Sequence, residues 1–182
     1  MSKLKTENTK KLLTSFAKGI IEQAKKILKA KKKDVSGKLL KSLKYKIKED
    51  KNGLNLSFQG AKHANFIDKG VSGKEKRQYF KDLYNKRRQS PFRYKSKKPP
   101  ASAFDKWAVR VGLAPRSKTG KFISRKSLQF ALRETIYKRG IASTSFFSNS
   151  VYTQYKKFRP KILSAFKQDL IQQIKQMETP KI

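Results

Sequence analysis

The first regular pattern in the chain covers residues 9–30, where apolar side chains recur every three or four positions and lysines occupy many of the positions between them. This spacing predicts an amphipathic helix, because residues three and four apart share one helix face. The basic run at residues 29–33 ends the helix. A basic amphipathic helix can lie on an anionic membrane surface, but such a stripe more commonly packs on its own domain, and we expect that role here.

The next pattern predicts a short helix followed by a β-hairpin. Ser36 is a candidate N-cap for a helix over the leucine-rich residues 39–43. Beyond it, over residues 44–59, apolar and polar side chains alternate on both sides of Asn52-Gly53. Alternation is the period of a strand with one buried face, and Asn-Gly suits the positive φ angles of a tight hairpin turn.

Helical patterns return in the second half of the chain. Ser102 and Asp105 have the spacing of a capping box, with Asp in place of the usual Glu, and open a helix that stops at Gly112. Ser124 is a candidate N-cap for a further helix that ends at Gly140.

A C-terminal helix is predicted after an extended segment at residues 141–151. Pro160 suits the first turn of this helix, because proline has no backbone N–H to leave unpaired there. Its apolar positions keep helical spacing and are expected to belong to the core: Leu163, Phe166, Leu170, Ile174 and Met177.

Together these elements predict an α+β fold in a single domain, residues 1–182. A small antiparallel β-sheet is flanked by an N-terminal, a central and a C-terminal amphipathic helix, and a long basic loop is inserted. Four segments follow: a helix and basic linker at 1–33, a helix and hairpin at 34–71, a basic insertion with a short helix at 72–125, and a helix, an extended segment and a final helix at 126–182.

Composition narrows the classes of function. The 182 residues include 47 Lys and Arg against 12 Asp and Glu, a formal net charge of +35, with no cysteine and one histidine. No cysteine means no disulfide, no thiolate metal site and no cysteine nucleophile, and one histidine cannot form a multi-histidine metal centre. No apolar stretch reaches the ~18 residues of a membrane span, so we expect a soluble intracellular protein with no membrane partner. The positive charge favours a polyanionic partner, above all nucleic acid, or docking beside acidic surfaces, while a lysine-rich surface is also produced by genome composition and the need for solubility alone.

Positive charge and aromatic side chains are interleaved at residues 74–98, where 11 Lys and Arg accompany two acidic residues. Nucleic-acid surfaces use cations for phosphates and aromatic rings for stacking, but a long exposed loop anchored by a few aromatic side chains has the same composition. The candidate contacts to DNA or to an acidic partner are Arg87, Arg88, Arg93, Lys95, Lys97 and Lys98.

Candidate catalytic chemistry is sparse. The carboxylates in the middle of the chain, Asp68, Asp82, Asp105 and Glu134, form no recognisable Mg²⁺-binding motif. His63 has no nucleophile with an orienting acid near it in sequence. We therefore expect no enzyme activity, no catalytic residue, no metal site and no cofactor.

Three stretches, taken in order, resemble the tail-completion or head-to-tail joining proteins of the neck of tailed bacteriophages. They are SGKLLKSL at 36–43, ANFIDKG at 64–70 and GIASTSFF at 140–147, with the hairpin between the first two. Asp68 stands where many members have Glu, and Ser145 where most have Pro. The positions that match the family's motifs are Gly37, Leu39, Ser42, Phe66, Asp68, Gly70, Gly140, Phe146 and Phe147.

The resemblance implies a small α+β subunit of a homo-oligomeric ring, six- or twelve-fold, around the DNA channel at the virion neck. Its partners would be further copies of itself, a portal-side adaptor, tail proteins and, without sequence specificity, the packaged double-stranded DNA. Such a subunit is assembled in the host cytoplasm. We expect the three motif glycines to set turns, and Leu39, Phe66, Phe146 and Phe147 to pack the sheet. The alternative function is a free, sequence-independent nucleic-acid-binding protein associated with the nucleoid or the ribosome, for which the charge of +35 is the main argument.

Overall fold

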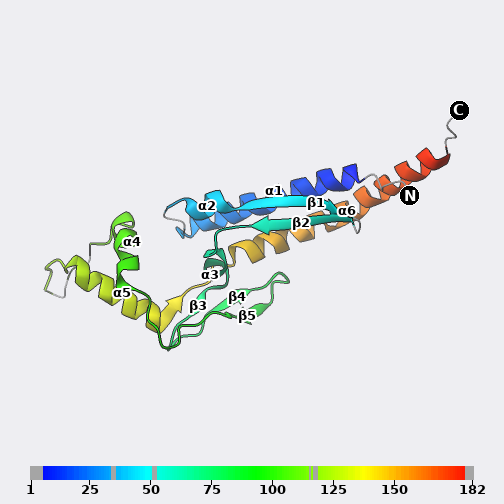
Figure 1. The fold of residues 1–182 in the computed structure, drawn as a ribbon. Helices are drawn as coiled ribbons and strands as arrows, with labels where there is room; N and C mark the ends of the chain where they lie inside the picture. The colour runs from blue at the N-terminus through cyan, green and yellow to red at the C-terminus, as the bar shows by residue number, and fades with distance from the viewer. Residues whose placement is uncertain (1–5, 34–35, 51–52, 115, 117–118, 179–182) are drawn as a thin grey trace.

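The structure is a computed structural model that describes residues 6–33, 36–50, 53–114, 116 and 119–178, with no description of the side chains of 176–178. It is a mixed α+β fold, as predicted (Figure 1). In chain order the elements are α1 (Glu7–Ala30), α2 (Lys38–Ser42), β1 (Lys44–Asp50), β2 (Gly53–Gln59), α3 (Ala64–Lys69), β3 (Val71–Ser72), β4 (Tyr79–Lys81), β5 (Arg87–Gln89), a 3-10 turn (Ala101–Phe104), α4 (Asp105–Arg110), α5 (Arg125–Arg139), β6 (Gly140–Ile141) and α6 (Phe146–Glu178).

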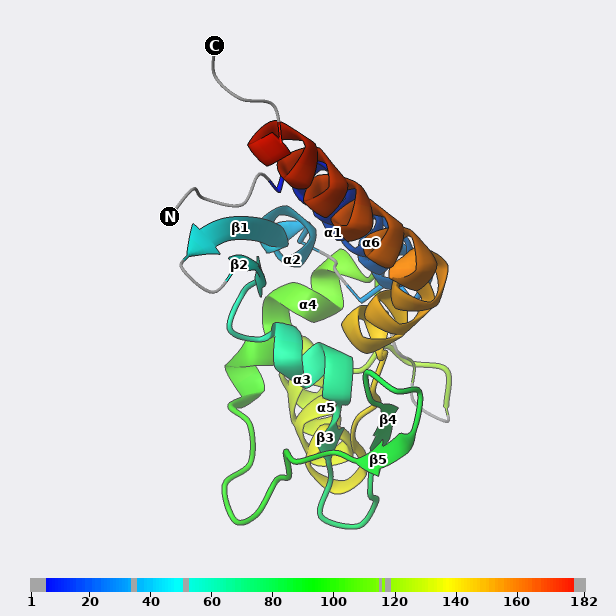
Figure 2. The ribbon, with the colours of Figure 1, turned by 90° about the vertical axis from the view of Figure 1, so that its right-hand side faces the viewer.

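Helices α1 and α6 form the long axis of the molecule and lie side by side (Figures 1 and 2). The predicted N-terminal helix is confirmed, and its apolar stripe faces α6. Phe16 and Ile20 of α1 pack with Phe158 of α6, and the rings of Phe16 and Phe158 lie 5.5 Å apart. The basic run after α1 ends the helix as predicted, with Lys31 as its C-cap.

The predicted hairpin is also confirmed. β1 and β2 pair antiparallel over their whole length, and Leu56 and Phe58 pack against the α1–α6 contact. The predicted turn is wrong for Gly53, which pairs with Asp50 and belongs to the ladder. Gly53 still has a positive φ of 124°, while Asn52 lies outside the described residues.

A second core cluster lies where α1 ends and α6 begins. Ala24 and Leu28 of α1 meet Leu39 of α2 and Phe146 of α6, all four almost fully buried. The short helix α2 places Leu39 there, but its predicted N-cap is wrong. Gly37 is the N-cap residue, and the Ser36 hydroxyl accepts only a long 3.4 Å hydrogen bond from the Lys38 amide.

The final helix is longer than its sequence pattern predicts. We expected an extended segment to Val151 and a helix from Pro160, whereas α6 begins at Phe146 and continues through Pro160. A proline inside a helix removes one backbone hydrogen bond and costs about 3 kcal/mol. The packing of Phe158 and Ile162 beside the proline favours the continuous helix in spite of that cost.

The apolar row predicted to be core on α6 is largely exposed. Leu163 is 68% exposed, Phe166 47% and Ile174 54%, and Leu170 is also exposed. At several turns of α6 the residue that faces α1 comes one position before the residue of the exposed row. Successive residues are about 100° apart around a helix, so the exposed row points to the side of the α1–α6 contact. Near its C-terminal end α6 projects past the start of α1 (Figure 1). Met177 lies outside the residues whose side chains are described.

The strands are divided among three two-stranded antiparallel ladders, β1–β2, β3–β6 and β4–β5, where we expected one small sheet. The predicted long basic loop is therefore partly ordered, because β4 and β5 form a hairpin within it. Val71 pairs with Ile141 in β3–β6, which joins the segment after α3 to the segment after α5.

Helices α4 and α5 form an arm away from the α1–α6 pair (Figure 1). The predicted capping box is wrong: Phe104 is the N-cap residue of α4, and Asp105 instead accepts bonds from Arg125 and Gln129 of α5. The prediction for α5 is confirmed, because the Ser124 hydroxyl accepts a 3.2 Å bond from the Ser127 amide. None of the helices in the described parts of the chain is both long and apolar enough to cross a bilayer.

Candidate functional site

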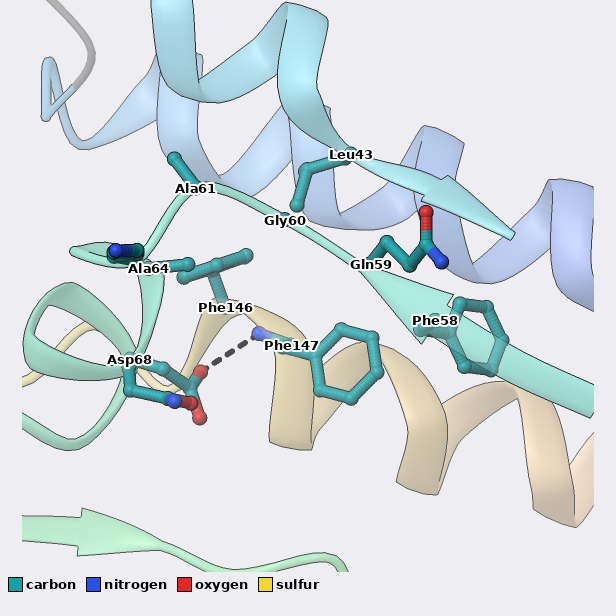
Figure 3. A pocket seen from close by; sticks show the side chains of 11 residues that line it. Leu43, Phe58, Gln59, Gly60, Ala61, Ala64, Asp68, Phe146 and Phe147 are labelled. Atoms are coloured by element: carbon teal, nitrogen blue, oxygen red, sulfur yellow. Dashed lines mark hydrogen bonds between the residues drawn. The ribbon is translucent and has the colours of Figure 1, made fainter. Parts of the chain in front are cut away.

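The motif residues from separate stretches meet around Asp68, at the end of α3. Figure 3 shows its side chain directed at the first turn of α6. Oδ1 accepts hydrogen bonds from the backbone amides of Phe147 at 2.8 Å and Ser148 at 3.4 Å, and Oδ2 accepts one from the Ser148 hydroxyl at 2.8 Å. Asp68 therefore supplies the N-terminal cap of α6 from another element. We call this contact the Asp68 junction.

Main-chain hydrogen bonds strengthen the Asp68 junction. The carbonyl of Ile67 accepts bonds from the amide and the hydroxyl of Thr144, and the carbonyl of Asp68 accepts bonds from the Ser145 amide and the Ser143 hydroxyl. The four donors come from the segment just before α6. We expected this segment to stay extended to Val151, but Ser145 has a left-handed φ of +47° and α6 starts directly after it, where the Asp68 cap lies.

Two motif glycines close the junction at the positions where the backbones approach most closely. Gly70 has φ +72°, and a Cβ built on it would lie 2.7 Å from the Ile141 carbonyl oxygen. Gly140 has φ +78°, and its Cβ would collide with the Val71 carbonyl oxygen. Both positions therefore exclude side chains for two reasons, the left-handed backbone and the lack of space. Gly37, the third motif glycine, also has a positive φ, of 69°.

The pKa of Asp68 is affected by the burial of its side chain. Only 5% of the residue is exposed, and burial raises the pKa of its carboxyl group above the ordinary value although the hydrogen bonds from Ser148 and Phe147 act in the opposite direction. Its two oxygens already accept three hydrogen bonds. The carboxylate is thus a structural acceptor that holds one helix end.

An open cavity of about 550 Å³ lies between the hairpin, α3 and the start of α6 (Figure 3). Its walls are mainly apolar, with the edge-on ring pair Phe58 and Phe147, at 5.3 Å, on one side. Asp68 is the acidic residue among the lining side chains. Nowhere in the described ranges do three or more His, Cys, Asp or Glu side chains gather closely enough to hold a metal ion.

We expected four motif residues to pack the sheet. Phe147 does so, because its ring contacts Phe58 of β2, whereas Leu39 and Phe146 are buried in the second core cluster, whose members come from helices and connecting segments. The prediction for Phe66 is wrong. Its ring is 42% exposed and packs edge-on against Phe92 at 4.5 Å, beside a separate open cavity, because α3 turns that side chain away from the hairpin. Ser42 is a connector, since its hydroxyl accepts a 2.9 Å bond from the Ala61 amide.

The six basic candidate residues do not form one cluster. Arg87 and Arg88 lie on β5, where Arg87 stacks 4.2 Å from the centre of the Tyr79 ring and Arg88 pairs with Asp82 at 3.0 Å. The other four follow in the segment that leads toward the arm: Arg93, Lys95, Lys97 and Lys98.

Several of these cations are already engaged within the protein. Lys98 pairs with Glu134 of α5 at 2.8 Å, and the guanidinium of Arg93 donates to the Lys74 carbonyl at 3.3 Å. Lys95 and Lys97 are exposed. Thus Arg88 and Lys98 hold the segment to carboxylates of the protein itself, and Arg87, Lys95 and Lys97 are the better placed of the six for an external anion.

Sequence reasoning missed a second buried carboxylate that caps a helix. Asp169 of α6 is 1% exposed and accepts hydrogen bonds from the backbone amides of Asn8 and Thr9 at the start of α1. A signal was present: Asp169 continues the helical row of Phe158 and Ala165 that faces α1. A charged residue in a core row indicates a buried partner.

Comparisons of the chain with protein-family models, with curated proteins and with solved structures find no match.

Proposed function

We propose that this protein is a structural subunit of the neck of a tailed bacteriophage, a tail-completion or head-to-tail connector protein that assembles as a ring around the DNA channel. The observation that carries the proposal is the convergence of the three motif stretches in space. Asp68 of the second stretch caps the helix that begins at Phe146 of the third, and Phe146 packs on Leu39 of the first. The second and third stretches, separated by residues 71–139, thus meet in one structural junction that also includes the first stretch, and this supports a common origin of the three motifs in one scaffold.

The exposed apolar row of α6 supports an assembled state. Leu163, Phe166, Leu170 and Ile174 occupy successive turns, and the described parts of the single chain bury none of them. Contiguous apolar surface of this kind marks protein interfaces. In the proposed ring this row is buried against a neighbouring subunit or against an adjoining neck protein, and the long α6 supplies a rigid edge for the contact.

The mechanism is mechanical and electrostatic. A closed ring repeats each subunit's surfaces by symmetry, so weak contacts act together and hold the portal side to the tail. The exposed cations Arg87, Lys95 and Lys97 reach an acidic partner or DNA phosphates, while Arg88 and Lys98 keep the basic segment in place. No covalent step is involved.

The test is association with virus particles. Lysate from cells that produce the parent genome is separated on a density gradient, and the chain is quantified by mass spectrometry in each fraction. Co-migration with DNA-filled particles at about six or about twelve copies per particle supports a neck ring. Migration with free protein, ribosomes or nucleoid contradicts it.

A free nucleic-acid-binding protein is the second candidate, favoured by the net charge of +35. Such a protein binds DNA or RNA tightly on its own, and its affinity falls steeply with salt because bound counterions are released. The gradient separates the two candidates, because a free binder migrates with nucleoid or ribosomes and is absent from purified particles.

A further inference from the structure

The outer face of the β1–β2 hairpin carries a straight row of lysines, Lys44, Lys46 and Lys48. All three are exposed, and the intervening Tyr45 and Ile47 are half-buried on the opposite face. Alternate residues of a strand point to the same side, so the three ammonium groups share one surface. We call it the hairpin lysine row.

The residues of β2 that pair with these three lysines have neutral polar side chains. Lys44 pairs with Gln59, Lys46 with Ser57 and Lys48 with Asn55. None of these neighbours is acidic, and within the described residues of the two strands the carboxylates are those of Glu49 and Asp50 at the hairpin tip.

The hairpin lysine row differs in this respect from the basic segment at 74–98. There, Arg88 and Lys98 lie within ion-pair distance of Asp82 and Glu134, which partly neutralises their charge. On the hairpin, the register places only amide and hydroxyl groups opposite the lysines. A lysine that faces no carboxylate across the ladder keeps its charge available to an external anion.

We infer that the hairpin lysine row is a further surface, separate from Arg87, Lys95 and Lys97, by which this protein contacts the phosphate backbone of double-stranded DNA. Successive lysines are two residues apart, about 6.8 Å along an antiparallel strand, so the three positive charges spread over about 14 Å, a length along which duplex DNA presents about four phosphates per strand. Lysine ammonium groups on flexible stems bind phosphate as point charges, without reading bases. The inference deepens the proposed function, on which it rests for the identity of the DNA as the packaged genome.

The experiment measures DNA binding by the purified full-length protein as a function of salt. The hairpin variant carries Lys44→Gln, Lys46→Gln and Lys48→Gln, and a control variant loses the same charge from one side of α1. The control substitutions are Lys11→Gln, Lys18→Gln and Lys26→Gln. The probe is a short duplex of random sequence with a fluorescent label, and circular dichroism verifies that both variants keep the wild-type fold and melting temperature.

Each phosphate contact contributes about 0.9 to the slope of log affinity against log salt. Loss of three contacts therefore makes the slope of the hairpin variant shallower by about 2.7, whereas the control variant changes it by less than about 1. Equal slopes for the two variants, an unchanged slope for the hairpin variant, or no binding by the wild type would overturn the inference. These outcomes do not affect the particle test, so a failed DNA surface and a failed neck assignment are distinguishable.

Discussion

Asp169, near the C-terminal end of α6, accepts hydrogen bonds from Thr9 at the start of the neighbouring helix α1. Its Oδ2 accepts the Thr9 amide at 2.9 Å and the Thr9 hydroxyl at 2.6 Å, and its Oδ1 accepts the Asn8 amide at 3.0 Å. The N-cap residue of α1 itself, Thr6, makes no side-chain capping bond. A carboxylate from a distant part of the chain therefore satisfies this helix end and fixes it against α6.

Asp169→Ala should lower the free energy of unfolding by about 1–3 kcal/mol, because it leaves amide donors at the start of α1 without their acceptor. Chemical denaturation measures the change. The control is Asp105→Ala, which breaks the more exposed ion pair with Arg125 and should lower stability by less than about 1 kcal/mol. Equal losses in the two variants would contradict a special role for Asp169.

Asp68→Ala should be more damaging, by about 2–4 kcal/mol, because it removes a helix cap and leaves buried donors on Phe147 and Ser148 unpaired. Ser148→Ala removes one of the three bonds and should cost about 1 kcal/mol. Equilibrium unfolding followed by circular dichroism gives both values. A loss below that of Ser148→Ala would show that α6 does not depend on this cap.

The two aspartates should have opposite effects on the pH dependence of stability. Burial alone would raise the pKa of Asp169, but the hydrogen bonds from Thr9 and Asn8 prevail and hold it below 3.8. Its contribution to stability is thus fully present above pH 3.8 and is lost as the pH falls through its folded pKa. Burial raises the pKa of Asp68 above 3.8, so its contribution is fully present below pH 3.8 and is lost as the pH rises through its folded pKa.

Denaturation curves across this pH range test both signs. Compared with the wild type, Asp169→Asn should lose less stability on acidification below pH 3.8. Asp68→Asn should instead improve relative to the wild type as the pH rises toward neutrality. The same sign for both variants would refute the assignment.

Gly140→Ala should prevent stable folding or lower stability by more than about 3 kcal/mol, because the added Cβ collides with the Val71 carbonyl at a position with φ +78°. Gly112→Ala is a matched control with φ +68° and open space around its Cβ, and should lower stability by only about 1 kcal/mol. Thermal unfolding compares the two. Similar melting temperatures for the two variants would mean that the β3–β6 contact shifts at little cost to accommodate the added Cβ.

The exposed row of α6 should matter for assembly and not for folding. Leu163→Gln, Phe166→Gln and Ile174→Gln together should leave the melting temperature of the isolated chain nearly unchanged, because these side chains are largely exposed. The same variant should be lost from DNA-filled particles in the gradient experiment. A control with Lys161→Gln, Lys167→Gln and Gln168→Ala should enter particles normally, and normal entry of the apolar-row variant would exclude this face as the interface.

The elements that the amino-acid sequence predicts correctly are those whose signals are local. The period of apolar residues defined α1, the alternation at 44–59 defined the β1–β2 hairpin, and Ser124 and Gly140 marked the ends of α5. Helix and strand periods, caps and turns depend on neighbours within a few residues, so a single chain shows them. Asp68, Gly70 and Phe146 were singled out by the resemblance to the neck-protein motifs and not by these local signals.

Tertiary structure decided the features that depend on distant groups. Asp68 starts α6 at Phe146, and packing on α1 carries that helix through Pro160, against the local preference of each segment. The packing of α6 on α1 also leaves the row that contains Leu163 exposed. The spacing of apolar residues predicts a helix face but does not tell which element covers that face. In the sequence, Asp169 has the polarity of a surface residue, and only the position of α1 beside α6 explains its burial. The physical reason is the same in each case: a buried acceptor or an apolar face is stabilised by its partner, and the partner's position is set by the whole fold.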